Sequence, residues 1–73
     1  MERTGPARVE RLVRDLITHY GLAATLLSVR HEPPQWLIVI RGDSDRVFDL
    51  TLPDTLTVAQ LRTQLEAHLL TRV

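Results

Sequence analysis

The hydrophobic positions of this chain change their spacing along the sequence, and each change predicts a different kind of element. In the first part of the chain, apolar side chains recur every three or four positions, which is the period of one face of an α-helix. Pro6 suits the first turn of such a helix, and Gly21 suits the position just beyond its end. We therefore predict a helix that begins at Pro6, ends before Gly21 and has the apolar stripe Val9, Leu12, Val13, Leu16, Ile17 and Tyr20.

After Ala24 the apolar period falls from 3.6 to two, which is typical of β-strands. The segment 31–35 contains two prolines and reads as a turn, because proline cannot donate a hydrogen bond within a sheet. The segment 42–45, Gly-Asp-Ser-Asp, reads as a second, tight turn. The predicted strands are Thr25–Arg30, Trp36–Arg41 and Arg46–Leu52.

A second helix is predicted near the carboxyl end of the chain. Thr57 and Gln60 have the spacing of a capping box, and Leu56 and Leu61 have that of a hydrophobic staple. The apolar stripe of this helix consists of Val58, Leu61, Leu65 and Leu69. The helix is predicted to run nearly to Val73. We predict an α+β protein of two layers in the order α-β-β-β-α, with a three-stranded antiparallel meander and both helices on one face. The whole chain, 1–73, is expected to be a single domain, with 1–5 as a flexible leader.

The register of the strands predicts which side chains meet the helices. With the turns centred on Pro33 and between Asp43 and Ser44, the core face of the sheet consists of Leu27, Val29, Leu37, Val39, Phe48, Leu50 and Leu52. The opposite face then consists of Leu26, Ser28, Arg30, Trp36, Ile38, Ile40, Val47, Asp49 and Thr51. A slip of one residue would exchange the faces of a strand.

The predicted outer face has an apolar centre and a polar rim, which is the usual anatomy of a protein interface. We predict a homodimer or partner surface made of Leu26, Arg30, Trp36, Ile38, Ile40 and Val47. A half-solvated sheet with residues of high strand propensity is the alternative. Pairing between the edge strands of two copies is a second route to a dimer, and the sequence does not separate it from face packing.

Composition narrows the remaining possibilities. A chain of 73 residues without cysteine cannot gain stability from disulfides, so association with another chain is the expected source of extra stability. Nine basic residues balance nine acidic ones, which disfavours nucleic acid as a partner without excluding it, and no apolar run could span a membrane. We expect a cytoplasmic protein, because the start of the chain lacks the apolar region of a signal peptide. We expect no metal or cofactor, because the histidines are scattered and there is no glycine-rich phosphate loop.

One histidine, His31, lies at a predicted strand end next to a loop, where functional residues are often found. The α-β-β-β-α order resembles that of double-stranded-RNA-binding domains and of HicA-type toxins, and in the toxins a histidine near the first strand acts in acid–base catalysis. The toxins carry Gly-Ser-His where this chain has Val29-Arg30-His31, and the RNA-binding domains have a lysine-rich start of the second helix where this chain has Thr57-Val58-Ala59-Gln60.

The arginines of the first helix, Arg8, Arg11 and Arg14, could contact phosphates, but Glu10 and Asp15 are placed to pair with two of them. We therefore predict a small non-catalytic protein–protein interaction module, of a regulatory or inhibitory kind. An RNA-binding or RNA-cleaving protein that uses His31 and these arginines is the alternative.

Overall fold

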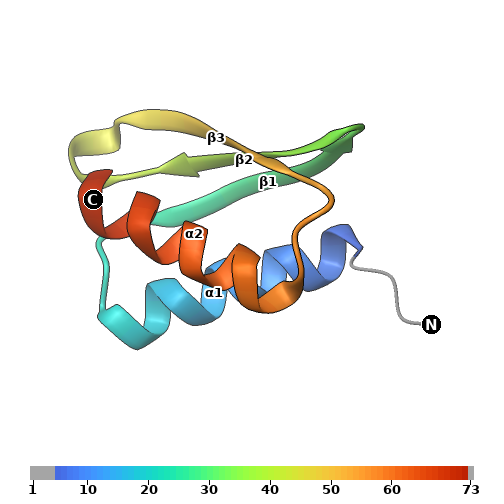
Figure 1. Ribbon diagram of the computed structural model, residues 1–73. Coiled ribbons are helices and arrows are strands. Elements are labelled where there is room, and N and C mark those ends of the chain that lie inside the picture. Colours follow the sequence, from blue (N-terminus) through green and yellow to red (C-terminus); the bar gives the residue numbers. More distant parts are fainter. Residues whose placement is uncertain (1–4, 73) are drawn as a thin grey trace.

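The computed structural model describes residues 5–72, and in that part of the chain two α-helices and three strands follow the predicted order (Figure 1). Apart from Gly5, the predicted leader lies outside the described residues. The α+β fold class is confirmed. The elements are α1 (Pro6–Tyr20), β1 (Thr25–Glu32), β2 (Gln35–Arg41), β3 (Val47–Pro53) and α2 (Val58–Arg72), with a short 3-10 turn at Asp43–Asp45.

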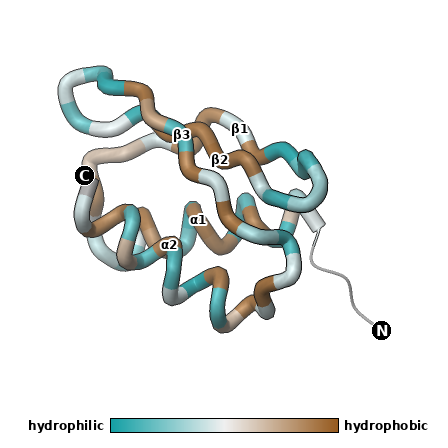
Figure 2. The backbone as a smooth tube through the Cα atoms, turned by 45° about the horizontal axis from the view of Figure 1, so that its top comes forward, coloured by the Kyte–Doolittle hydropathy of each residue, from teal (hydrophilic) through white to brown (hydrophobic). Residues whose placement is uncertain are grey.

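The strands form one antiparallel sheet in the order β1-β2-β3, and both helices lie against the same face of it (Figure 1). Hydrophobic segments run through all three strands of this sheet (Figure 2). The buried core lies between the two layers and consists of Val9, Val13, Leu16, Trp36, Ile38, Ile40, Leu50, Leu52, Leu61, Leu65 and Leu69.

The helix ends form as their sequences predict. Gly21 follows α1 in the left-handed conformation (φ 59°, ψ 39°), where a side chain would be strained. The backbone N–H of Leu22 then donates to the carbonyl oxygen of Ile17 at 3.0 Å. At the start of α2, the backbone N–H of Thr57 donates to the Gln60 side-chain oxygen at 2.9 Å, and the Gln60 N–H donates to the Thr57 hydroxyl at 3.2 Å. This reciprocal pair is the predicted capping box.

The loop between β2 and β3 is one residue longer than the predicted turn at 42–45. Arg41 pairs with Val47, so the loop is the five-residue segment 42–46. Ser44 and Asp45 both have positive φ angles (62° and 59°), and the Asp43 carboxylate accepts a hydrogen bond from the Ser44 N–H at 2.9 Å. Aspartate adopts positive φ angles more readily than most residues, and the bond from the Ser44 N–H to Asp43 stabilises the turn locally. The longer loop shifts β2 by one residue against β3.

The first hairpin also differs by one residue. Pro33 and Pro34, joined by a cis peptide bond, form a two-residue turn, and Glu32 pairs directly with Gln35. Further along β1, a bulge inserts Leu27 between two paired positions, so that Leu26 pairs with Ile40 while Ser28 pairs with Val39. A bulge of this kind leaves one residue unpaired and shifts the alternation of the strand. Leu27 is consequently 46% exposed rather than in the core.

Together the two shifts turn β2 over relative to the prediction. Trp36, Ile38 and Ile40, which we predicted on the outer face, are buried against the helices. Leu37 and Val39, which we predicted in the core, alternate with them and face away from the helices. The predicted register is therefore wrong for β2, whereas Leu50 and Leu52 of β3 lie in the core as predicted.

Candidate interaction surface

The sheet face opposite the helices, which we call the open face, is not covered by any element of residues 5–72 (Figure 1). Its centre is Leu37 and Val39 of β2, whose side chains are only partly buried. Val39 lies between Ser28 of β1 and Asp49 of β3 in the ladder. Because strand residues alternate, these neighbours point to the same side as Val39.

Three further rows complete the open face. They are Glu32-Gln35-Pro53, Arg30-Leu37-Thr51 and Thr25-Arg41-Val47. Val47 is 60% exposed, and the bulged Leu27 adds a second exposed apolar side chain. The open face thus has an apolar strip, defined as Leu27, Leu37, Val39 and Val47. Its polar rim consists of Thr25, Ser28, Arg30, Glu32, Gln35, Arg41, Asp49 and Thr51.

Of the six residues predicted for the partner surface, Arg30 and Val47 lie on the open face. Leu26 is partly buried and packs against the core, so its predicted outward position is wrong. Trp36, Ile38 and Ile40 are core residues for the reason given above. The apolar side chains that do face outward are those of the apolar strip. Its β2 members, Leu37 and Val39, alternate with the buried residues in the run from Trp36 to Ile40.

A second feature, at one end of the sheet, joins His31 to two residues that the sequence did not connect with it. The His31 ring stacks on Trp36, with centroids 4.4 Å apart, and its Nε2 lies 2.8 Å from Asp54 Oδ2. The backbone N–H of Asp54 donates to the carbonyl oxygen of Pro34 at 3.0 Å. These contacts hold the turn between β1 and β2 against Asp54, which follows β3. Asp54 lies 23 residues from His31, so no local motif links them.

The Trp36 indole is part of the same end of the core. Its ring is only 1% exposed, and its Nε1 has no hydrogen-bond partner in the described structure. An unpartnered indole N–H costs free energy. The position of the Trp36 ring is therefore set by its apolar packing and not by a hydrogen bond from its N–H.

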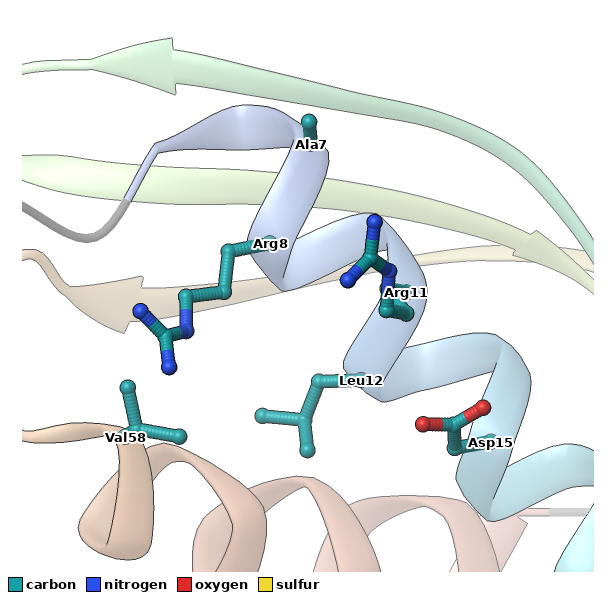
Figure 3. A pocket seen from close by; sticks show the side chains of 6 residues that line it. All are labelled: Ala7, Arg8, Arg11, Leu12, Asp15 and Val58. Atoms are coloured by element: carbon teal, nitrogen blue, oxygen red, sulfur yellow. The ribbon is translucent and has the colours of Figure 1, made fainter.

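The charged side chains of α1 lie on the helix layer, away from the open face. Arg14 pairs with Glu10 at 2.9 Å, as predicted. In Figure 3 the Arg11 guanidinium is directed away from the Asp15 carboxylate, so the second predicted pair is not formed. Arg8 and Arg11 line a shallow depression of about 470 Å³ together with Ala7, Leu12, Asp15 and Val58 (Figure 3). This depression mixes a carboxylate and apolar groups with its guanidinium groups.

Where α1 ends, Tyr20 contacts α2. Its hydroxyl donates to the Glu66 carboxylate at 2.5 Å, and Arg62 lies 3.5 Å from the same carboxylate. This hydrogen bond raises the pKa of Tyr20, because the ionised phenol could not donate it.

Within residues 5–72, histidine, cysteine and acidic side chains do not gather in groups of three or more that could hold a metal ion. None of the helices in this part of the chain is long and apolar enough to cross a membrane. Comparison of the sequence with known protein families and curated proteins, and of the structure with solved structures, finds no match.

Proposed function

We propose that this protein is a small non-catalytic interaction module that binds another protein chain through the open face of its sheet. The observation that carries this proposal is that β2 places large apolar side chains on both faces of the sheet, whereas the helices cover only one. Exposed apolar patches with a polar rim are typical of binding surfaces.

The energetic case rests on the apolar strip. Full burial of a leucine or valine side chain is worth about 1.5–3 kcal/mol, and Leu37 and Val39 are already partly buried. Covering the four residues of the strip would therefore contribute roughly 3–6 kcal/mol before the cost of association. A core this small rarely supplies more than about 3–5 kcal/mol, so a bound partner would add substantially to the stability of the fold.

A regulatory or inhibitory role is the form of this function that we favour, in the cytoplasm. A domain of 73 residues that presents one flat apolar face can occupy and mask a surface on a larger protein. Fold alone does not assign such a role, so it is tested through binding.

The test is a matched pair of variants. Val39→Asp places a charge at the centre of the open face, and Ala67→Asp places one on the exposed surface of α2. We expect both variants to keep the circular dichroism spectrum of the native protein, because neither position lies in the core. Val39→Asp should lose association with its partner chain, measured as a complex of fixed stoichiometry, and Ala67→Asp should keep it. Equal binding by the two variants would contradict the proposal.

The His31–Asp54 contact favours one alternative function, RNA binding or cleavage. A carboxylate bonded to an imidazole can orient a general base, although the same contact also holds the turn in place. Ribonuclease activity that disappears in His31→Ala, or retention of RNA at physiological ionic strength that weakens with salt, would support this alternative. We expect neither.

A further inference from the structure

We propose that the occupant of the open face is a second copy of this chain, packed face to face about a two-fold axis that runs parallel to β2. This inference rests on the proposed function and specifies its partner. It is drawn from the placement of Arg30 and Asp49 beside the apolar strip, because these two opposite charges lie on opposite sides of β2.

The open face carries Arg30 on one side of β2 and Asp49 on the other. Arg30 lies on β1 between Glu32 and the row of Asp49, and Asp49 lies on β3 one row away from Arg30. A two-fold axis along β2 lays β1 of one copy over β3 of the other, so each Arg30 approaches Asp49 of the second copy. Glu32 is the only residue of 5–72 that forms an ion pair with Arg30, at 3.5 Å and exposed to solvent, and Asp49 forms none.

The distances allow this contact. With two sheets about 10 Å apart and residues rising about 3.3 Å along a strand, the Cα atoms of Arg30 and of Asp49 in the second copy are about 12 Å apart. An extended arginine and an aspartate can span that distance with a charge-assisted hydrogen bond. The same arrangement places Leu37 on Leu37 and Val39 on Val39 at the axis, so the apolar centres cover each other.

A two-fold axis across the strands lays each strand over itself, so Arg30 on β1 does not face Asp49 on β3 of the second copy. When that axis passes through the row of Val39, it also brings Asp49 onto Asp49 of the second copy. Like charges in direct contact disfavour such an arrangement. In the favoured orientation Arg41 meets its own copy, but it lies at the end of β2, is exposed, and has Asp45 at 4.0 Å to offset its charge.

Edge-to-edge pairing through β1 is disfavoured in this sheet. The bulge at Leu27 interrupts the ladder positions of β1, and bulges are a common means of blocking edge pairing. Pairing through β3 would leave Arg30 of each copy far from Asp49 of the other, because β1 and β3 are on opposite sides of the sheet. Charge reversal at these two positions therefore distinguishes face packing from edge pairing.

The affinity expected for this dimer is modest. The open face measures about 23 Å along its strands and about 14 Å across them, or roughly 300–400 Å² per copy. Stable interfaces bury about 800 Å² per partner, so we expect a reversible dimer with a Kd of about 10 µM to 1 mM. The association must accordingly be measured up to millimolar protein.

The test is charge reversal at Arg30 and Asp49, followed by sedimentation equilibrium. Arg30→Asp alone and Asp49→Arg alone should each weaken self-association at least about tenfold, because both contacts of the dimer become repulsive. An equimolar mixture of the two variants should associate as tightly as the native protein, because both contacts are then attractive. The double variant should also recover.

Matched controls exclude a simple effect of net charge. Arg11→Asp and Asp15→Arg make the same changes of charge on the exposed side of α1, and each should associate like the native protein. A native protein that stays monomeric at millimolar concentration would overturn the inference, and so would reversed variants whose mixture does not recover. Neither result contradicts the proposed function, which is tested separately by the partner binding of Val39→Asp and Ala67→Asp. A failure of the dimer can therefore be distinguished from a failure of the proposed function.

Discussion

The orientation of β2 can be tested by comparing Ile38→Val with Val39→Thr. Ile38 is fully buried and sits between Val29 and Leu50 in the sheet. Removing one methyl group from such a site costs about 0.5–1.5 kcal/mol, through lost transfer free energy and the cavity left behind. Val39→Thr replaces a methyl by a hydroxyl on the open face, where water can solvate it, and substitutions of that kind usually change stability by less than about 0.5 kcal/mol.

If the opposite face of β2 met the helices, the two variants would exchange their effects on stability. In that register Val39 would be in the core, and a buried hydroxyl without a partner costs about 1–3 kcal/mol. Ile38 would then be near solvent, and its loss of one methyl would have little effect. The sign of the difference between the two variants therefore identifies which face of β2 meets the helices.

Urea unfolding followed by tryptophan fluorescence gives the measurement. Trp36 is the only tryptophan and is 1% exposed, so its emission reports the loss of the core directly. For a domain of this size, a slope of about 1 kcal/mol/M makes a loss of 1 kcal/mol visible as a shift of about 1 M in the midpoint. The protein should be dilute enough that the midpoint does not depend on concentration. A larger loss for Val39→Thr than for Ile38→Val would refute the register described above.

Three further predictions concern the elements that support the sheet. Thr57→Ala removes the capping-box hydroxyl and should cost about 0.5–2 kcal/mol, measured by the same urea titration, with Thr63→Ala as a control inside α2. Gly21→Ala places a side chain at a positive φ and should cost about 1 kcal/mol, and an unchanged stability would contradict the left-handed end of α1. The raised pKa of Tyr20 implies that its stabilising effect is complete below the ordinary tyrosine pKa of about 10 and is lost as the pH rises through the higher value in the folded protein. Tyr20→Phe should therefore reduce the fall in stability above pH 10, and an identical fall in both proteins would argue against the bond to Glu66.

Local signals in the sequence predicted the helices well. The stripe of α1 and its terminal glycine, and the capping box of α2, depend on residues within four positions of one another. Such interactions are decided by local spacing, so a single sequence contains them. The element order and the α+β class follow from the same local signals.

The faces of the sheet could not be obtained in this way, because the central strand is apolar at every position from Trp36 to Ile40. In a strand with polar and apolar residues in alternation, a one-residue slip would bury polar groups and be recognisable. Here the slip exchanges one apolar set for another, so hydrophobicity does not decide the register. The lengths of the two loops and the bulge at Leu27 decide it, and these depend on backbone geometry.

The apolar run nevertheless predicted that β2 has apolar side chains on both faces of the sheet. A strand that is apolar on both faces in a sheet with helices on one side must present one set of side chains outward. The sequence indicated that an outward apolar set exists, and the structure shows that its β2 members are Leu37 and Val39. Its role as a binding surface stays a prediction. The His31–Asp54 contact had no such signal, since it depends on the folded arrangement of two distant loops.

A dilution series followed by methyl NMR tests the central claim, self-association through the open face, most directly. The methyl signals of Leu37 and Val39 should move as the protein is diluted from millimolar to micromolar concentration, and that of Ala67 on the exposed side of α2 should stay in place. Signals that do not depend on concentration, or shifts confined to the helices, would contradict the claim.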